Sequence, residues 1–470
     1  MVNYCNLRIG DKMKKFQKRI FSIILSIAIL STIMLPMPFT VSAVGDSDFI
    51  FNSATGTITG YNGSASDLII PSTIGGTPVT KIGEDAFSMN VSLISVTIPD
   101  CIVSLGIYSF YGCNSLTNVS IGNGITSISQ YAFMNCKSLS NLIFGSGIIS
   151  IEEDAFGSCE SLTSINIPNS VTHIGGCAFM FCSSLNDVTI PNSVTTIGDG
   201  AFAYCISLTS ITIPNSVISI SNEYFGAFQG CSSLLNINVD SANANYLSED
   251  GILFNKNKTI LVAYPGGRNG SCSIPNGVIK IDNFAFAYCR LLTAITFPSS
   301  TTTIGNYAFA TCTSLSLLTI PKNIKSINMD AFYNCTSLTS VTIQNGIEYI
   351  SQCVFYGCTS LINISIPKSI IHMSGSIFED CDKLTIFGYK NSYAETYATE
   401  NSIPFKLLGD VNDDGNVTSA DALQSLKNAS GRITLIDSQK FAADVTGDNN
   451  VTAVDALKIL QFASGRITTF

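Results

Sequence analysis

The sequence predicts a mixed, β-rich fold in which a repeat solenoid is followed by a small all-α module. Three observations support this prediction. A motif of the form A-F-x-x-C-x-x-L returns at intervals of 23 residues over most of the chain. Apolar residues alternate after each copy of the motif, as they do in a strand with one buried face. After Phe405 this repeat stops, and a second repeat with an offset of 34 residues begins at Asp410.

The phenylalanine of the motif marks about twelve copies of the first repeat. A leucine follows six residues after each phenylalanine, and aliphatic residues follow after nine and eleven, such as Val188 and Ile190. Proline often ends the run, as at Pro191, so each copy predicts a short strand with a breaker after it. One copy cannot bury its apolar face alone, but stacked copies share a continuous core. The phenylalanines are Phe87, Phe110, Phe133, Phe156, Phe179, Phe202, Phe228, Phe286, Phe309, Phe332, Phe355 and Phe378.

The composition argues against two classes of function. The 470 residues carry a net charge of −9, which disfavours nucleic-acid binding because that function needs a basic patch. With two histidines and no tryptophan, the chain has little material for a histidine-based triad or a histidine-rich metal site. No nucleophile elbow, zinc-protease motif or phosphate loop is present. The few paired acids, such as Glu152 and Glu153, fall in turns where a solvated charge is the ordinary interpretation. We therefore predict that the chain is not an enzyme.

The N-terminal 43 residues have the pattern of an export signal. Basic residues from Lys14 to Arg19 precede an apolar run over 20–35, and Val41-Ser42-Ala43 provides a small-residue cleavage site. An uncleaved membrane anchor is the alternative, but the run is short for a span of about 20 residues. The sequence thus predicts a secreted, extracellular protein with no membrane attachment after cleavage.

The cysteines allow two interpretations. Eleven of the sixteen lie three residues after a repeat phenylalanine, so they would stack along one edge, one in each turn. A disulfide framework is one possibility in a secreted chain. Stacked parallel side chains have the wrong direction for such bonds, and free cysteine packs well where a small buried residue is needed. A ladder of reduced thiols is therefore favoured. The eleven are Cys113, Cys136, Cys159, Cys182, Cys205, Cys231, Cys289, Cys312, Cys335, Cys358 and Cys381.

The repeat units resemble the BspA-type leucine-rich repeats of bacterial surface and secreted proteins. Examples are IPNSVTTIGDGAFAYCISLTSI and IPNSVTHIGGCAFMFCSSLNDV. The entry segment ITGYNGSASDLIIPSTIGGTPVTKIGEDAF is similar to the family's N-terminal cap, YLSEDGILFNKNKTILVAYPGG to its hairpin insert, and GYKNSYAETYATENSIPF to a closing helix. The resemblance implies a leucine-rich-repeat solenoid. Its outward strand positions carry mostly Ser, Thr and Asn, which suit either a plain strand surface or an interaction surface for an unknown protein or glycan.

The stretch GDVNDDGNVTSAD predicts a calcium loop, because it places oxygen-bearing side chains at places 1, 3, 5, 9 and 12 of a twelve-residue window. Gly415 at place 6 permits the sharp turn that such a loop needs. The second copy begins at Asp444, so two Ca²⁺ ions are predicted. The expected ligands are Asp410, Asn412, Asp414, the carbonyl of Asn416, Thr418 and Asp421, then Asp444, Thr446, Asp448, the carbonyl of Asn450, Thr452 and Asp455.

The two loops, each followed by an apolar helical stripe, closely resemble a type I dockerin, the module that attaches secreted proteins to cohesins of a cellulosome scaffold. Two departures stand out in the second loop: Thr446 replaces Asn or Asp, and Asn449 replaces Gly. We expect the turn to survive, since Asn tolerates the left-handed conformation, and calcium to bind more weakly there. The resemblance implies cohesin contacts at Ser419, Ala420, Leu426, Lys427, Ala453, Val454, Leu460 and Gln461.

These observations predict five segments and one leading function. The segments are a signal peptide (1–43), an N-terminal cap (44–81), leucine-rich repeats (82–388, with a hairpin insert at about 240–272), a C-terminal cap and linker (389–406) and a dockerin (407–470). The leading hypothesis is a non-catalytic accessory protein of a cellulosome-type assembly, docked to cohesin in a cell-surface or free complex. The alternatives are a glycoside-hydrolase-type component of a polysaccharide catabolic process and a stand-alone adhesin.

Overall fold

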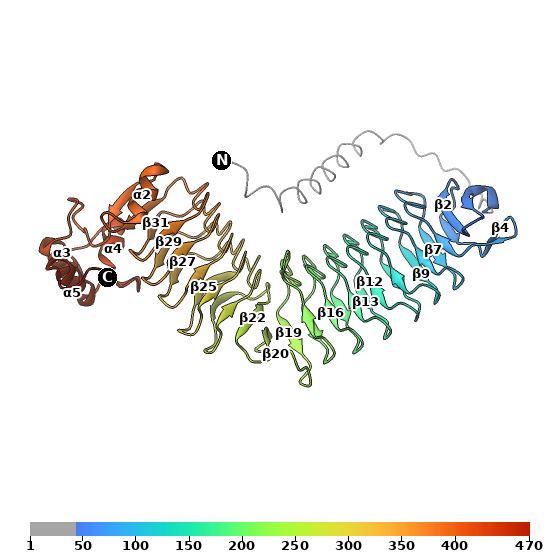
Figure 1. The fold of residues 1–470 in the computed structure, drawn as a ribbon, viewed down its shortest axis with the longest axis horizontal. Coiled ribbons are helices and arrows are strands. Elements are labelled where there is room, and N and C mark those ends of the chain that lie inside the picture. The colour runs from blue at the N-terminus through green and yellow to red at the C-terminus, as the bar shows by residue number, and fades with distance from the viewer. Residues whose placement is uncertain (1–43) are drawn as a thin grey trace. The chain divides into compact units, whose positions relative to one another are not determined.

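The computed structural model describes residues 44–470, and the export signal predicted for residues 1–43 lies outside the described residues. Residues 44–470 form one compact unit. In this unit the turns of a β-solenoid lie side by side, and helices follow at its C-terminal end (Figure 1). The solenoid has about 15 turns of about 23 residues, which confirms the predicted fold class. Among the described residues no helix is long and apolar enough to cross a bilayer.

Each repeat contributes the predicted strand to one face of the solenoid, named here the long-strand face. The paired strands are parallel and in register, so Ile165 lies opposite Val188. The strands are β3 (Asp67–Ile69), β7 (Ser95–Ile98), β9 (Asn118–Ile121), β11 (Asn141–Ile143), β13 (Ser164–Asn166), β15 (Asp187–Thr189), β17 (Ser210–Ile213), β19 (Asn236–Val239), β23 (Gly270–Ser273), β25 (Leu292–Thr296), β27 (Leu317–Ile320), β29 (Ser340–Ile343), β31 (Asn363–Ser365), β33 (Thr385–Gly388) and β34 (Phe405–Leu407).

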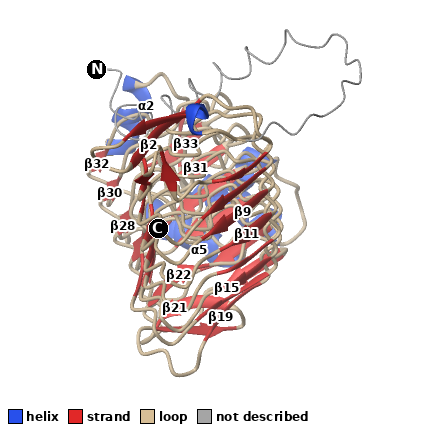
Figure 2. Ribbon diagram, turned by 90° about the vertical axis from the view of Figure 1, so that its right-hand side faces the viewer, coloured by secondary structure: helices blue, strands red, loops and turns tan. Residues whose placement is uncertain are grey.

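The return arm of each turn adds a short strand to a second face, which lies opposite the first in Figure 2. These strands are β2 (Thr57–Tyr61), β6 (Lys81–Ile82), β8 (Ser104–Leu105), β10 (Ser127–Ile128), β12 (Ser150–Ile151), β14 (His173–Ile174), β16 (Thr196–Ile197), β18 (Ser219–Ile220), β22 (Ile260–Ala263), β24 (Lys280–Ile281), β26 (Thr303–Ile304), β28 (Ser326–Ile327), β30 (Tyr349–Ile350) and β32 (His372–Met373).

The remaining elements lie at the ends of the solenoid and in the insert. Antiparallel pairing joins β1 to β2, β4 to β5, and β20 to β21 to β22. Helix α2 starts after Ser392, whose side chain accepts a hydrogen bond from the Glu395 amide. These elements are η1 (Asp46–Asp48), β1 (Phe49–Asn52), β4 (Thr73–Ile74), β5 (Thr77–Pro78), β20 (Tyr246–Glu249), β21 (Ile252–Asn255), α2 (Tyr393–Glu400), α3 (Ser419–Ala429), α4 (Asp437–Ala443) and α5 (Ala453–Ala463).

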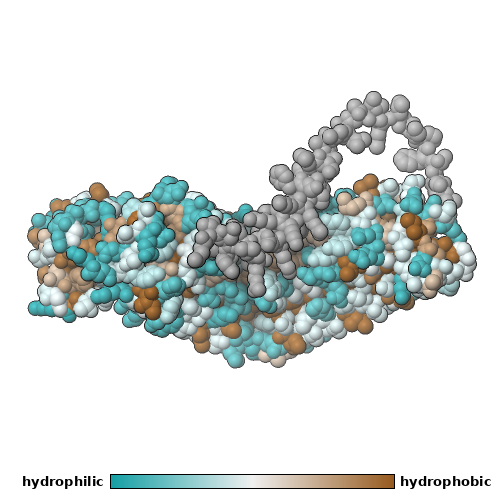
Figure 3. Space-filling model, turned by 45° about the horizontal axis from the view of Figure 1, so that its top comes forward, coloured by the Kyte–Doolittle hydropathy of each residue, from teal (hydrophilic) through white to brown (hydrophobic). Residues whose placement is uncertain are grey.

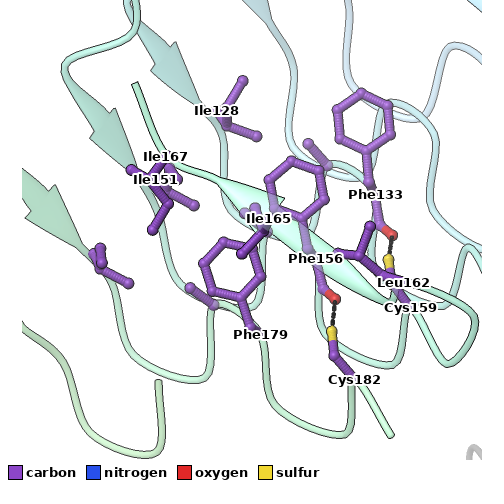
Figure 4. Close-up of a cluster of buried hydrophobic side chains, with 14 of the residues drawn as sticks. Ile128, Phe133, Ile151, Phe156, Cys159, Leu162, Ile165, Ile167, Phe179 and Cys182 are labelled. Atoms are coloured by element: carbon purple, nitrogen blue, oxygen red, sulfur yellow. Dashed lines mark hydrogen bonds between the residues drawn. The ribbon is translucent and has the colours of Figure 1, made fainter. Parts of the chain in front are cut away.

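The repeat phenylalanines form a stacked ladder through the core. Phe156 is fully buried, and its ring lies 5.4 Å from that of Phe133 and 5.6 Å from that of Phe179 (Figure 4). In the insert, where the sequence motif fails, Tyr264 stacks on Phe286 at 4.7 Å. Tyrosine thus continues the ladder through a turn that has no motif phenylalanine, which is one reason why the structure has more turns than the motif has copies.

The motif cysteines are free thiols that bond to the preceding turn. The Cys159 thiol donates to the Phe133 carbonyl at 3.4 Å, and Cys182 donates to Phe156 at 3.3 Å (Figure 4). The other nine motif cysteines repeat this bond, with Tyr264 as the acceptor for Cys289. Burial raises the pKa of Cys182 to about 12, so the thiol form prevails. The favoured interpretation, a ladder of reduced thiols, is confirmed for these eleven residues.

Two left-handed residues flank the ladder phenylalanine in most turns. Around Phe133 they are Tyr131, with φ 62°, and Asn135, with φ 61°. The amides of these three residues donate to carbonyls of the next turn, at 3.1, 2.7 and 2.8 Å for Tyr131, Asn135 and Phe133. Because of the left-handed residues, every second backbone amide in this segment points towards the next turn of the solenoid. The backbone at this edge is therefore hydrogen-bonded although it forms no strand.

One of these left-handed positions carries a buried carboxylate, and its replacement should be stabilising. Asp330 is 6% exposed with φ 56°, and burial raises its pKa to about 6. The folded protein releases this proton at a higher pH than the unfolded chain does. The free energy of unfolding therefore falls as the pH rises from about 4 to about 6. Asp330→Asn removes the ionisation and keeps a residue that tolerates this backbone. We expect the free energy of unfolding to rise by about 1–3 kcal/mol at pH 7 and to change little at pH 4, as measured by urea unfolding.

Asp85 provides the matched control, since it lies two residues before Phe87 with φ 55° and is exposed. Asp85→Asn should change the unfolding free energy by less than about 0.5 kcal/mol at either pH. Equal stabilisation by Asp330→Asn at pH 4 and pH 7 would show that ionisation of Asp330 is not the cause.

Candidate functional site in the C-terminal loop and helix pairs

Two loops of twelve residues lead into helices α3 and α5 by the same local structure. Loop one spans residues 410–421 and loop two spans residues 444–455. Thr418 is the N-cap of α3, and its side chain forms a reciprocal capping box with Asp421. Thr452 and Asp455 repeat this arrangement at α5. Places 9 and 12 of each loop are therefore fixed by the start of a helix.

The two loops also share their backbone turns. Place 6 is left-handed in both, with φ 82° at Gly415 and 65° at Asn449, which confirms that Asn takes over this role of Gly. Place 4 is left-handed as well, with φ 60° at Asp413 and 72° at Gly447. Place 4 could not be predicted from the sequence, because the two loops use different residues there. Loop two thus repeats the conformation of loop one despite its departures in sequence.

The carboxylates at places 1 and 12 tie loop one together. Asp410 accepts hydrogen bonds from the amides of Asp414 at 3.1 Å and Gly415 at 2.7 Å. Asp421 is fully buried and accepts from the amides of Asn412 at 3.0 Å and Thr418 at 2.8 Å. The loop therefore closes around two carboxylates that come from its opposite ends.

Loop two closes in the same way. Asp444 accepts from the amides of Gly447 at 2.8 Å and Asn449 at 2.7 Å. The buried Asp455 accepts from the amides of Thr446 at 3.0 Å and Thr452 at 2.9 Å. At place 3 the Thr446 hydroxyl donates to Asp444 at 3.3 Å, so this hydroxyl lies beside the first carboxylate.

The charge and donor chemistry of both loops suit a hard cation. Burial raises the pKa of Asp410, and the nearby carboxylates of Asp421 and Asp414 raise it further. Burial and the Asp455 carboxylate act in the same direction on the pKa of Asp444. Within residues 44–470 no three Asp, Glu, His or Cys side chains converge as a ready metal cluster. The donors are instead a mixture of carboxylate, amide, hydroxyl and carbonyl oxygens, the set that calcium prefers.

The helices turn most of the predicted contact residues outward. Helices α3 and α5 pack together, with Ser425 and Ile459 buried. Leu423 and Leu457 are also exposed, so the apolar surface is larger than the predicted contact residues alone would form. Of the predicted contacts, the half-buried ones are Lys427 and Gln461, and the exposed ones are Ser419, Ala420, Leu426, Ala453, Val454 and Leu460.

The solenoid offers a different kind of surface. In the visible face of Figure 3 the hydrophobic residues are mostly scattered singly among polar ones. Outward positions such as Thr97 and Ser210 are hydroxyl-bearing. Several half-buried aromatic side chains at the turn edge stack on each other, as Tyr108 does on Tyr131 at 4.7 Å, so one ring face of each is already covered. This surface suits polar contacts better than stacking on a ligand.

Comparison with known proteins agrees with both parts of the structure. The family model for the BspA type leucine rich repeat region matches residues 80–205, 149–260 and 268–396. The model for the dockerin type I domain matches residues 408–462. Neither describes a catalytic domain. Among curated proteins, none matches this chain.

Solved structures resemble the solenoid. A leucine rich cell surface protein from Faecalibacterium prausnitzii is 34% identical, with a TM-score of 0.65 over 78% of this chain and 98% of that chain. A leucine-rich repeat protein from Eubacterium ventriosum is 26% identical, with a TM-score of 0.51 over 70% and 81%. The pneumococcal vaccine antigen PcpA, 23% identical with a TM-score of 0.51 over 75% and 91%, shares the fold.

The stacked turns and the paired loop–helix units define a leucine-rich-repeat solenoid joined to a small helical C-terminal domain. The chain belongs to the BspA-type leucine-rich repeat family and carries a C-terminal type I dockerin domain.

Proposed function

We propose that this protein is a secreted, non-catalytic accessory component of a cellulosome-type assembly. Its dockerin binds a cohesin of a scaffold protein in the presence of calcium, and its solenoid displays an interaction surface for a protein or glycan. The observation that carries this proposal is the repeated geometry of the loops. Both halves of the dockerin share their capping boxes, left-handed turns and carboxylate closures.

Calcium would hold each loop in the conformation that supports the docking helices. Asp410, Asn412, Asp414 and Asp421 would bind it in loop one, with the Asn416 carbonyl and Thr418. Asp444, Asp448 and Asp455 would do so in loop two, with Thr446, Thr452 and the Asn450 carbonyl. Since a hydroxyl is a weaker ligand than an amide oxygen, the affinity of loop two should be lower. When bound, the ions offset the repulsion between carboxylates and link metal binding to folding.

The docking face is the exposed apolar surface of α3 and α5. Its two halves differ at equivalent places, with Ser419 and Ala420 in one and Ala453 and Val454 in the other. We therefore propose one preferred docking orientation. Exchanging Ala453 and Val454 for Ser and Ala should alter cohesin binding, and unchanged affinity would contradict a single orientation.

The test is binding of the whole chain to a panel of cohesins by surface plasmon resonance, with calcium and then with EDTA. Calcium-dependent binding to at least one cohesin supports the docking role. A folded, calcium-loaded chain that binds none would overturn it, and the adhesin alternative would then lead. Hydrolysis of plant polysaccharides by the purified chain would overturn the non-catalytic assignment and favour the glycoside-hydrolase alternative.

A further inference from the structure

Loop two of the dockerin lies against the long-strand face of the solenoid. The hydroxyl of Thr319, in β27, donates to the Gly447 carbonyl at 3.3 Å. The Gln344 side chain, directly after β29, donates to the Thr446 carbonyl at 3.4 Å. Both acceptors belong to places 3 and 4 of loop two. The contact therefore involves the part of the loop that contains Thr446, whose hydroxyl is the weakest of the proposed calcium ligands.

A repeated strand sequence shows how the loop covers the solenoid. The sequence Ser-Val-Thr-Ile occurs in β7 and again in β29, so Thr97 and Thr342 occupy equivalent outward positions. Thr97 is exposed, whereas Thr342 is half-buried. A Cβ atom added to Gly447 would lie 2.5 Å from Cγ2 of Thr342, closer than side-chain atoms approach one another. Thr342 is therefore covered at least partly by loop two.

This contact explains why the loops differ at place 4. Loop one has Asp413 there, and its carboxylate forms an ion pair with Lys406 of β34 at 2.6 Å. Loop two has no room for a side chain at Gly447, since the backbone itself approaches the solenoid. Place 4 is thus the point at which each loop meets the repeat domain, through an ion pair in one case and close packing in the other.

The dockerin core continues this connection into the solenoid. Phe387 of β33 is buried with its ring 4.8 Å from that of Phe441 in α4. Tyr389 lies 6.0 Å from Phe462 of α5 and 5.8 Å from Phe470, and its hydroxyl accepts from the Phe470 amide at 2.9 Å. The last turn of the repeat domain therefore supplies aromatic side chains to the core of the helical domain.

We propose that the long-strand face at β27 and β29 is a binding surface for loop two, so that the last turns and the dockerin act as one rigid body. The consequence for calcium rests on the proposed function: a loop held in place by the solenoid loses less freedom when it binds an ion. By reciprocity, calcium in loop two strengthens the contact with the solenoid. The solenoid then keeps a fixed orientation relative to the dockerin, and therefore relative to the scaffold that the dockerin would bind.

The experiment compares Thr342→Arg with Thr97→Arg in the whole chain. A large side chain at residue 342 should displace loop two, whereas at 97 it extends into solvent. In EDTA, we expect amide hydrogen exchange in residues 441–452 to become about tenfold faster in Thr342→Arg and to stay unchanged in Thr97→Arg. In calcium titrations, we expect Thr342→Arg to weaken loop two by about tenfold and to leave loop one unchanged.

A second pair of variants keeps the test decisive if Thr342→Arg disturbs its own strand. Gly447→Asn adds a side chain that the left-handed backbone tolerates, so it should speed exchange in the same segment. Adding Thr342→Ala removes the obstructing Cγ2 atom and should restore much of the protection. Identical exchange in Thr342→Arg, Gly447→Asn and the unaltered chain would overturn the proposed contact. An unaltered chain that binds no calcium would refute the proposed function, while the exchange data would still decide the contact.

Discussion

A chain with Asp421→Asn is expected to bind one calcium ion instead of two and to bind its cohesin about 100-fold more weakly, or about 2.8 kcal/mol. Asp421 is fully buried and accepts hydrogen bonds from the amides of Val411 and Asn412 and from Thr418. An amide in its place points a donor towards these donors and removes a charge from the proposed calcium site. Loop one should then no longer close against the start of α3. Isothermal titration with calcium, and then with cohesin, measures both effects.

Asp413→Asn is the matched control, because it makes the same chemical change in the same loop. Asp413 is exposed and pairs with Lys406 instead of turning into the loop. Loss of an exposed ion pair costs about 0–1 kcal/mol, so two calcium ions and nearly full cohesin affinity should remain. If Asp421→Asn still binds two calcium ions, the ligand assignment for loop one is wrong. If both variants lose cohesin equally, general charge explains the effect better than loop closure.

The features that the sequence could predict are those that repeat. Phe156 and its equivalents return every 23 residues because every turn must fill the same place in the core, and the structure confirms the fold that they predict. The loop pattern at Asp410 and Asp444 was visible for the same reason. Asn449 could be assigned to a left-handed turn because Asn is one of the few residues that tolerates it.

Features that depend on tertiary contacts could not be predicted. Tyr131 gives no local sign of a left-handed backbone, since that conformation is imposed by hydrogen bonds to the next turn. Leu423 and Leu457 belong to the apolar stripes of their helices, but they are exposed, and the residues buried in α3 and α5 include Ala422, Ser425, Ala456 and Ile459 instead. The close approach of the Gly447 backbone to Thr342 joins residues more than one hundred positions apart, so no local pattern could reveal it.

Phe156→Ala is expected to destabilise the solenoid by about 3–5 kcal/mol. The ring is fully buried between those of Phe133 and Phe179, so its removal leaves a cavity and separates two stacked neighbours. Because each turn of a solenoid contacts only the adjacent ones, the loss should concentrate in the nearby turns. Hydrogen exchange should therefore rise most in β11, β13 and β15. Urea unfolding, followed by circular dichroism, measures the total change.

Phe144→Ala is the comparison at an aromatic ring that lies outside the ladder. Phe144 is half-buried and meets Phe156 edge-on at 5.6 Å, so it lies beside the ladder and not within it. Its truncation should cost about 1–2 kcal/mol, because the Phe144 side chain buries less apolar area on folding than Phe156 does, and solvent can fill the space that it leaves. A ladder that carries the stability of the solenoid requires the larger loss at Phe156. Equal losses at both positions, despite the smaller burial of Phe144, would contradict a special role of the stacked ladder in holding adjacent turns together.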